Sequence, residues 1–483
     1  MKNHTKENKL NILLICILIG FVSVYLFKLG DFGLFNVDEP FHAEVAREIV
    51  ESNNWIVPKF NYEAIYDKPI LFYWLEALSM KIFGINEFSA RLPSACSAIF
   101  CSMLLAYLLR KLYGITPALI SVLVLMSSLQ FIAYSKLAVL DMLLTNFITC
   151  SIISFFLGYI KINNNSNFSG FNIWYLLGFI FLGLGILSKG PVAIVIVGMT
   201  LLPFFILVKK LYYLVKNPSF WFGFILFLVL VLPWYLAVHY ATNGEFTKIF
   251  FGVHNFDRFT SVVAHHSAPL LFFIPVISVG FMPWIFCFPQ AIYFLLKRNK
   301  KDFLISTQEQ FYWLSLWWFL IVFIFFTVSK TKLISYILPL YPPLSILVGL
   351  WLWQVTNKKA YALLAFLFVV LMIYFSFITV ALPILDKRLV LQLELRTFSN
   401  YIKKENIELI TLNAYKPGFV FYTGKKIFDA KNLKNFNKKI MENKRYAFVT
   451  DKENFKKLPQ NKIYLCDLNT SDRYMFFTNY PRE

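Results

Sequence analysis

Apolar segments of membrane-spanning length recur along the whole sequence and restrict the folds open to it. A transmembrane helix needs about 20 mostly apolar residues. Eleven stretches meet this requirement, at residues 11–29, 92–109, 115–134, 142–160, 172–187, 191–208, 219–238, 270–296, 311–328, 333–354 and 360–383. They raise the mean hydropathy to +0.60 and the hydrophobic fraction to 58%, above the range of soluble domains. We therefore predict an all-α polytopic membrane protein with about 11 to 13 transmembrane helices.

Lysine and arginine predict how these spans are oriented. The first span follows lysines as a signal peptide does, but no small-residue cleavage site follows it, so we expect it to be retained. With the N-terminus in the cytoplasm, every cytoplasmic turn is basic, as the positive-inside rule requires. These turns contain Arg110 and Lys111, Lys161, Lys209, Lys210 and Lys216, Lys297, Arg298, Lys300 and Lys301, and Lys358 and Lys359. An odd number of spans then places the C-terminus on the outer side.

The same topology predicts two domains. Residues 1–385 form a transmembrane domain whose long polar loops, 30–91 and 239–269, lie outside. Residues 386–483 form a soluble external domain, in which a helix-like stretch (LELRTFSNYIKKEN) precedes strand-like runs (IELITL, FVFYTG, YAFVT, KIYLCD). This pattern is typical of a small α/β unit. The external loops also contain five of the six histidines, His42, His239, His254, His265 and His266, so we expect the chemistry there.

The net charge of +20 does not indicate nucleic-acid binding, because the basic residues are scattered through short loops and the polar tail. In the C-terminal domain they suit either anionic lipid headgroups or a solvated surface. The six cysteines provide neither a disulfide framework nor a CxxC metal motif.

Acidic residues at the predicted membrane surface are the first candidates for chemistry. Asp38 and Glu39 open the first external loop, where they are either catalytic or an ordinary helix start with Asp38 as the N-cap. Asp141 lies at the mouth of a span, shortly after Lys136. It is either an interfacial ion pair with that lysine or a functional carboxylate, since a charge there is costly unless paired or hydrated. Lys189, in a Ser-Lys-Gly-Pro turn, allows the same two interpretations.

Cations on the outer side are the second group of candidates. Lys68 follows Asp67 just before an apolar aromatic run, which suits a lipid phosphate, a snorkelling side chain or a local ion pair. Lys330 and Lys332 lie where the positive-inside rule disfavours lysine, so we interpret them as phosphate ligands. Tyr336 either hydrogen-bonds the same phosphate or anchors the helix at the interface.

The second long loop contains His254 and Arg258, four residues apart and therefore on one face of a helix. His254 and Asp67 are candidate ligands of a divalent metal, because imidazole and carboxylate suit zinc. The alternative is that His254 hydrogen-bonds a phosphate or a sugar. Zinc is the one cofactor candidate.

From about residue 36 to 345 the motifs follow an order that resembles the GT-C membrane glycosyltransferases. It most resembles the lipid A 4-amino-4-deoxy-L-arabinose transferases, relatives of the protein O-mannosyltransferases. The motifs are DEPxHAEVARE, YDKPxLxYWL, FGxNEFSARLP, LDMxLT, SKGP, FFxxHNxxRF and SKTKLxSYILPLYPP. The resemblance implies a GT-C fold with external juxtamembrane helices in a bacterial inner membrane. It also implies an undecaprenyl-phosphate sugar donor, used on the periplasmic face.

Matched motif by motif, Asp38 takes the position of the family's key acidic residue and Asp141 that of its second aspartate. Lys68 takes the position of a lysine associated with phosphate binding. Two residues depart from the family pattern: Asp67 stands where glutamate is usual, and Phe41 where arginine is common in the aminoarabinose enzymes.

The chemistry implied by the resemblance explains why these residue types are needed. Breaking the sugar–phosphate bond builds negative charge on the departing lipid phosphate, so cations aimed at it stabilise the transition state. The candidates are Lys68, Arg258, Lys330 and Lys332, with His254 and Tyr336 as hydrogen-bonding groups. A hydroxyl acceptor needs a general base, for which Asp38 is the candidate. A lipid A phosphate is already ionised, and Asp38 would then orient groups.

Three other functions compete with sugar transfer to lipid A. The same donor can serve a protein hydroxyl or another envelope glycan. A transporter of lipid-linked sugars usually shows inverted repeats and helices broken at mid-membrane, whereas the charges here cluster in external loops. A structural scaffold predicts no loss of activity when Asp38 or Lys68 is changed.

Overall fold

A computed structural model of the chain describes residues 2–35, 37–164, 170–257, 260–261, 268–298, 303, 305–356, 360–384, 391–414, 417–466 and 474–481. The chain divides into two compact units. The first comprises Met1–Phe27, Tyr66–Leu75 and Arg91–Phe375, and the second comprises Lys28–Ile65, Glu76–Ala90 and Ser376–Glu483.

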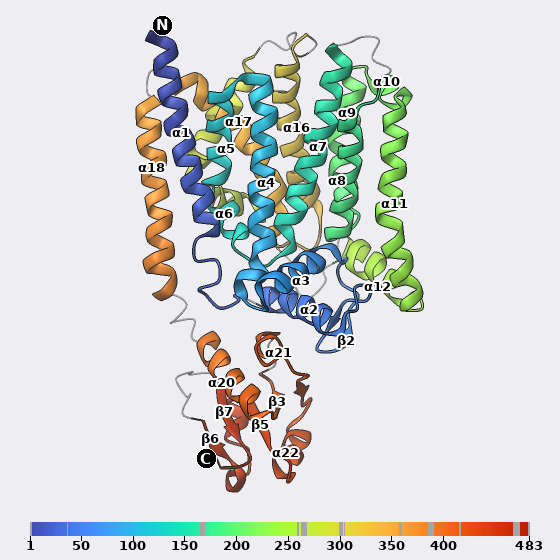
Figure 1. The fold of residues 1–483 in the computed structure, drawn as a ribbon, viewed down its shortest axis with the longest axis vertical. Helices are drawn as coiled ribbons and strands as arrows, with labels where there is room; N and C mark the ends of the chain where they lie inside the picture. The colour runs from blue at the N-terminus through green and yellow to red at the C-terminus, as the bar shows by residue number, and fades with distance from the viewer. Residues whose placement is uncertain are drawn as a thin grey trace. The chain divides into compact units, whose positions relative to one another are not determined.

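The first unit is a bundle of helices that run side by side (Figure 1). Its main helices are α1 (Lys2–Leu26), α4 (Glu87–Tyr113, from Arg91 on), α5 (Ile115–Met126), α6 (Leu129–Ser135), α7 (Leu140–Asn164), α8 (Ile173–Lys189), α9 (Val192–Leu207), α11 (Pro218–Ala241), α14 (Phe273–Gly280), α15 (Phe288–Leu296), α16 (Thr307–Val328), α17 (Tyr341–Thr356) and α18 (Ala360–Ser376). Shorter elements connect them: α10 (Leu211–Lys216), α12 (Glu245–Phe251), the π-helical turns η1 (Gly252–Asp257) and η6 (Phe377–Ala381), and the 3-10 turns η2 (Leu270–Phe272), η3 (Trp284–Cys287) and η5 (Ile334–Leu340).

The described helices confirm the predicted all-α polytopic fold. Seven of them are long and apolar enough to cross a membrane. Two further pairs of helices are bent, by 69° in Ile115–Ser135 and by 107° in Leu270–Leu296, and α8 and α9 are shorter apolar helices. Each of the eleven predicted segments corresponds to one of these helices or bent pairs.

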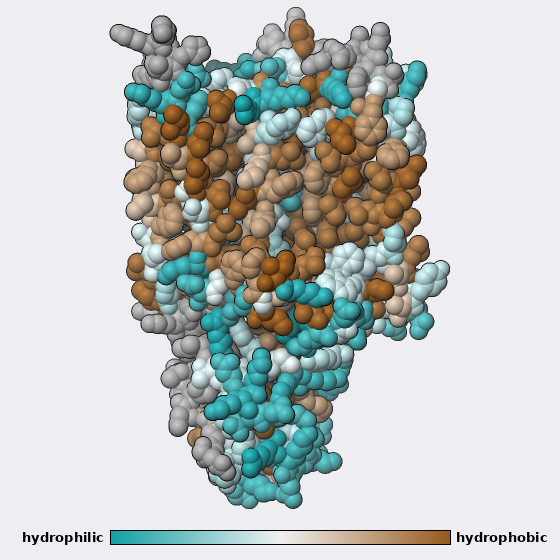
Figure 2. Space-filling model, viewed as in Figure 1, coloured by the Kyte–Doolittle hydropathy of each residue, from teal (hydrophilic) through white to brown (hydrophobic). Residues whose placement is uncertain are grey.

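Burial within the bundle separates central helices from peripheral ones. The apolar part of α7 is 100% buried inside the unit, whereas those of α1, α11 and α18 are 33% buried. Small residues allow the tight packing of α7 on α8, since a Cβ on Gly178 would lie 2.8 Å from the Phe155 ring. The outer helices turn their apolar side chains outward (Figure 2), as a lipid-facing surface requires.

The second unit begins with the loop that the sequence predicts to be the first external loop. It contains α2 (Asp38–Ser52), the short antiparallel hairpin of β1 (Lys59–Phe60) and β2 (Glu63–Ala64), and the part of α3 (Leu71–Phe83) that follows Leu75. At 13 residues, α3 is too short to cross a membrane. Val37, not Asp38, is the N-cap of α2, so the N-cap interpretation of Asp38 was wrong: Asp38 is the first helical residue.

The C-terminal part of the second unit is the predicted small α/β domain. Its five-stranded sheet has the order β4-β3-β5-β7-β6, with β3 parallel to β4 and β5, and β7 antiparallel to β5 and β6. The strands are β3 (Glu408–Leu412), β4 (Phe428–Asp429), β5 (Tyr446–Asp451), β6 (Tyr464–Leu465) and β7 (Tyr474–Thr478). The helices are α20 (Leu391–Glu405), α21 (Pro417–Thr423), α22 (Leu433–Met441) and α23 (Lys452–Phe455), with a 3-10 turn, η7 (Gln460–Lys462).

Alternating strand residues build one core on each side of this sheet. Leu409 packs with α20 and α21, whereas its neighbour Ile410 packs with α22. The predicted strand FVFYTG is wrong, because its first five residues belong to helix α21 and Gly424 follows that helix. Its residues are almost all buried, and a short, continuously apolar run does not distinguish a buried strand from a buried helix.

Candidate functional site

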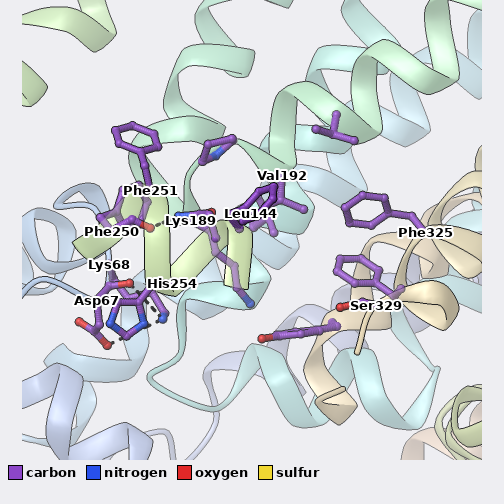
Figure 3. Close-up of a pocket in the computed structure, with 16 residues that line it drawn as sticks. Asp67, Lys68, Leu144, Lys189, Val192, Phe250, Phe251, His254, Phe325 and Ser329 are labelled. Atoms are coloured by element: carbon purple, nitrogen blue, oxygen red, sulfur yellow. Dashed lines mark hydrogen bonds and ion pairs between the residues drawn. The ribbon is translucent and has the colours of Figure 1, made fainter. Parts of the chain in front are cut away.

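The first unit contains a cavity of about 430 Å³ that gathers residues from six parts of the sequence (Figure 3). The segment before α3 contributes Asp67 and Lys68, and the end of α8 contributes Lys189. His254 comes from η1, Ser329 from the end of α16 and Tyr336 from η5. The apolar wall consists of Leu144, Pro191, Val192, Val195, Phe250, Phe251, Phe256, Phe325 and Phe326.

Asp67, Lys68 and His254 lie together at one side of the cavity (Figure 3). The Lys68 Nζ lies 3.8 Å from Asp67 Oδ2 and donates to the Asp67 backbone oxygen at 3.3 Å. Asp67 Oδ1 is buried and accepts no hydrogen bond from the residues that the structure describes. One carboxylate oxygen on this side is therefore left without a hydrogen-bond donor from the described residues.

A hydrogen bond joins the two segments that provide this side of the cavity. The Tyr66 hydroxyl donates to Glu245 Oε2 at 3.1 Å, so it links the residue before Asp67 to the start of α12. Partial burial and the nearby Glu245 carboxylate raise the pKa of Tyr66, which keeps its hydroxyl protonated as the donor.

Asp141 and Lys189 form an ion pair at the meeting point of α7 and α8. Both side chains are largely buried, with exposed fractions of 12% and 13%. The Lys189 Nζ also lies 4.7 Å from the centre of the Tyr336 ring, in a cation–π arrangement. The ion pair therefore places the Lys189 ammonium group and the Tyr336 phenol together at the cavity.

This geometry corrects the predicted partner of Asp141. Lys136 does not pair with it but donates to the backbone oxygens of Val24 at 2.9 Å and Phe27 at 2.8 Å, around the end of α1. A cation is favourable at a helix C-terminus, where carbonyls lack intrahelical partners. Lys189 lies 48 residues from Asp141, so only the fold brings them together.

A glycine shapes the wall of the cavity beside Lys189. Gly190 has φ +102°, which L-residues rarely adopt, and a Cβ there would lie 2.6 Å from Phe250 Cζ. The next helix begins at Val192. The Ser-Lys-Gly-Pro motif is therefore a turn that places a lysine and an aromatic ring at the same site.

Lys330 and Lys332 are not among the described residues that line this cavity. Lys330 is exposed. Lys332 is buried, with 8% exposed, and its Nζ donates to the Ser329 backbone oxygen at 2.8 Å. Arg258 lies outside the described residues. The roles of all three stay predictions.

Asp38 and Glu39 belong to the second unit, at the start of α2. Asp38 is exposed, whereas Glu39 is 1% exposed and its Oε2 accepts a hydrogen bond from the Phe35 amide at 2.5 Å. The catalytic roles of Asp38, Glu39 and Asp141 likewise stay predictions.

Glu76 is a buried acid that the sequence-based reasoning missed. It is 0% exposed, and neither carboxyl oxygen has a hydrogen-bond partner among the described residues. Burial, and secondarily the charge of Glu39, raise its pKa well above 4.5. In the sequence, the apolar run around Glu76 has no clear periodicity that would show which face of the helix is buried. Glu76 could therefore not be distinguished from an exposed glutamate.

The described residues contain no group of three His, Cys, Asp or Glu side chains that could hold a metal ion. Asp67 and His254 line the same cavity, so they provide two candidate zinc ligands, whereas protein zinc sites use three or four. The metal therefore stays a prediction.

Comparison with known proteins places the fold among membrane glycosyltransferases. Residues 67–236 match the family model described as dolichyl-phosphate-mannose-protein mannosyltransferase. The crystal structure of ArnT from Cupriavidus metallidurans bound to undecaprenyl phosphate is 19% identical, with a TM-score of 0.77 over 96% of this chain and 98% of that one. The chain therefore has the GT-C fold. The archaeal oligosaccharyltransferase AglB from Archaeoglobus fulgidus is a more distant structural match, at 11% identity and a TM-score of 0.57 over 92% of this chain and 70% of that one.

Curated relatives narrow the resemblance within the GT-C proteins. The undecaprenyl phosphate-alpha-4-amino-4-deoxy-L-arabinose arabinosyl transferase of Shewanella sediminis is 32% identical over 379 residues, or 78% of this chain and 66% of the relative. The protein of the same name from Enterobacter sp. is 32% identical over 342 residues, or 69% of this chain and 58% of the relative. The matched part thus spans less than two thirds of these relatives. The chain is a multi-pass protein of a bacterial inner membrane.

Proposed function

We propose that this protein transfers a monosaccharide, an amino sugar such as 4-amino-4-deoxy-L-arabinose, from undecaprenyl phosphate to lipid A. The observation that carries the proposal is the cavity, which combines Lys68, Lys189 and Tyr336 with a wall of phenylalanines. Cations and a phenol suit a phosphate, and the aromatic wall suits the first prenyl units attached to it. The relatives named after an undecaprenyl-phosphate-linked sugar support the same donor.

The proposed reaction exchanges one bond at the anomeric carbon of the sugar. The bond from this carbon to the donor phosphate oxygen breaks, and undecaprenyl phosphate leaves with the electron pair. An acceptor oxygen forms the new bond. Lys68 stabilises the charge that develops on the leaving phosphate. If the acceptor is an ionised lipid A phosphate, no proton has to be removed; a hydroxyl acceptor would lose its proton to Asp38.

The orientation is part of the proposal. We place the N-terminus in the cytoplasm and the C-terminal domain in the periplasm, because the turns assigned to the cytoplasm are basic. The cavity, Asp38 and the acceptor site would then face the periplasm.

Mass spectrometry of lipid A from cells with and without the gene tests the acceptor. We expect an added mass of one sugar only when the gene is expressed. An unchanged lipid A spectrum in cells that contain the protein would exclude lipid A. Transfer to a protein hydroxyl would then be tested next, since the mannosyltransferase model that matches residues 67–236 describes that acceptor class.

A purified assay with an undecaprenyl-phosphate sugar tests the role of Lys68. We expect Lys68→Met to lower kcat by about 10²-fold, as loss of one charge-stabilising donor does in other enzymes. Lys59→Met is the matched control, because Lys59 lies in β1 of the other unit. Equal rates for the two variants would exclude Lys68 from the leaving-phosphate site.

A further inference from the structure

The C-terminal domain packs on the first external loop within the second unit. Helix α21 lies against α2, and Asn61 between β1 and β2 binds the Ile427 backbone twice. Asn61 Nδ2 donates to the Ile427 oxygen at 3.0 Å, and the Ile427 amide donates to Asn61 Oδ1 at 2.8 Å. These paired bonds fix the register between the loop and the domain, although more than 360 residues separate them.

A second contact joins the end of α21 to the last turns of α2. The Tyr62 amide donates to the Glu48 carboxylate at 3.0 Å, and the Tyr62 hydroxyl donates to the Gly424 oxygen at 3.2 Å. Gly424 follows α21 with φ +63°, and a Cβ there would lie 3.4 Å from Arg47 Nη1. The C-terminal end of α2 is thus held closely by the domain.

Tyr422 of α21 reaches the other end of α2. Its hydroxyl accepts a hydrogen bond from the Leu34 amide at 3.0 Å and donates one to Glu87 Oε1 at 3.0 Å. Arg396 of α20 forms an ion pair with the same Glu87 oxygen and lies 5.5 Å from the centre of the Tyr422 ring. Burial raises the pKa of Tyr422 to about 12, so the hydroxyl stays protonated at neutral pH.

The segment bound by Tyr422 leads directly into Asp38. The Phe35 amide, next to Leu34, donates to Glu39 Oε2 at 2.5 Å. The N-cap Val37 makes no side-chain hydrogen bond to the first turn of α2. The backbone that precedes Asp38 is therefore held by Tyr422 and Glu39 rather than by an ordinary N-cap side chain.

We propose that the C-terminal domain is a positioning element for the acidic start of α2, and that Tyr422, held by Glu87 and Arg396, is its key residue. Tyr422 binds the backbone four residues before Asp38 and is not among the described residues that line the cavity. Its loss should therefore disturb Asp38 and leave donor binding intact. The catalytic part of this inference rests on the proposed function, whereas its structural part does not.

Hydrogen exchange of the full-length protein in lipid nanodiscs tests the structural part. We expect Tyr422→Phe to speed exchange severalfold in peptides covering residues 30–40, because the Leu34 amide loses its acceptor. Tyr480→Phe is the matched control, since its hydroxyl pairs with that of Tyr401 inside the C-terminal domain. Unchanged exchange at residues 30–40 in Tyr422→Phe would overturn the proposal.

Variants of Glu87 separate positioning from general stability. Glu87→Gln keeps an acceptor oxygen for the Tyr422 hydroxyl and should retain most of the protection at residues 30–40, whereas Glu87→Ala should lose it. If both variants exchange at residues 30–40 as slowly as the wild type, Glu87 does not hold Tyr422 in place.

The transfer assay tests the catalytic part. For Tyr422→Phe we expect kcat to fall about tenfold with an unchanged KM for the donor. A raised donor KM with unchanged kcat would contradict positioning of Asp38. If the wild-type protein shows no transfer, the proposed function fails, while the exchange experiment still decides whether Tyr422 holds the loop.

Discussion

Two acidic residues, Asp141 and Glu76, have surroundings in the fold that their neighbours in the sequence do not indicate. Asp141 and Lys189 come from different helices and form an ion pair beside Tyr336. Sequence reasoning found Asp141 but assigned it to Lys136, because a nearby lysine is the only partner that spacing can indicate. It missed Glu76 altogether, since burial of a single acid depends on the packing of the whole loop.

Substitution of the ion pair separates its structural role from its catalytic one. Asp141→Asn leaves Lys189 without a carboxylate in a largely buried place, which should cost about 1–3 kcal/mol. The double variant D141L/K189M removes both charges and should recover most of the thermal stability without recovering transfer. Full activity in the double variant would show that the pair is only structural.

The buried acid Glu76 predicts a pH-dependent stability. Its pKa in the folded protein is raised well above 4.5, so the unfolded chain loses this proton at a lower pH than the folded one. The stability associated with Glu76 is complete below pH 4.5 and is lost as the pH rises toward the folded-state pKa.

Glu76→Gln should therefore melt close to wild type near pH 4 and at a higher temperature than wild type at pH 8. Glu63→Gln, at an exposed glutamate of the same loop, should show no such difference. Thermal melts at the two pH values check this, and a Glu76→Gln variant that is less stable at pH 8 would contradict a neutral Glu76.

At the scale of elements, the helices of the membrane unit could be predicted from hydropathy, because each span needs a long apolar run. The same reasoning failed for α21, whose residues 419–423 are a mostly buried run too short to show a helical period. Pro417 at its start and Gly424 after its end were the available signals, since proline favours the first helical turn and glycine the position after the last.

Substitution of Gly190, which precedes α9, and of Gly198, which lies within α9, tests how the turn after α8 shapes the cavity. Gly190→Ala would force a Cβ against Phe250 at a positive φ, and should destabilise the protein by about 1–3 kcal/mol and lower donor affinity. Gly198→Ala in α9 meets no atom within 4 Å and should be neutral or slightly stabilising. Thermal melts and donor titrations distinguish the two variants. Equal melting temperatures and equal donor affinities would mean that the turn accommodates the extra Cβ.

For the whole molecule, the orientation inferred from the lysine pattern stays a prediction. The cavity could not be predicted from the sequence, because it draws on six segments between Asp67 and Tyr336. The GT-C fold could be predicted because the order of several short motifs along the chain is specific even though each motif alone is weak. The division into two units, which assigns the first external loop to the unit of the C-terminal domain, has no counterpart in the apolar pattern.

The orientation can be tested with single cysteines in a cysteine-free background. A membrane-impermeant maleimide added to spheroplasts should label Lys431→Cys in the C-terminal domain and leave Arg110→Cys unlabelled until the membrane is broken. The reverse pattern would place the N-terminus outside.

The phenylalanine wall of the cavity affects a side reaction of the proposed sugar donor, its hydrolysis by water. Phe250, Phe251, Phe325 and Phe326 provide no hydrogen-bonding groups beside Lys68 and Lys189. Water next to these four rings would find no side-chain partner on them to orient it toward the sugar, and exclusion of water protects reactive groups from hydrolysis. If the proposed function holds, the protein should therefore leave the lipid-linked sugar intact when no acceptor is present, so that the cell does not waste an activated donor.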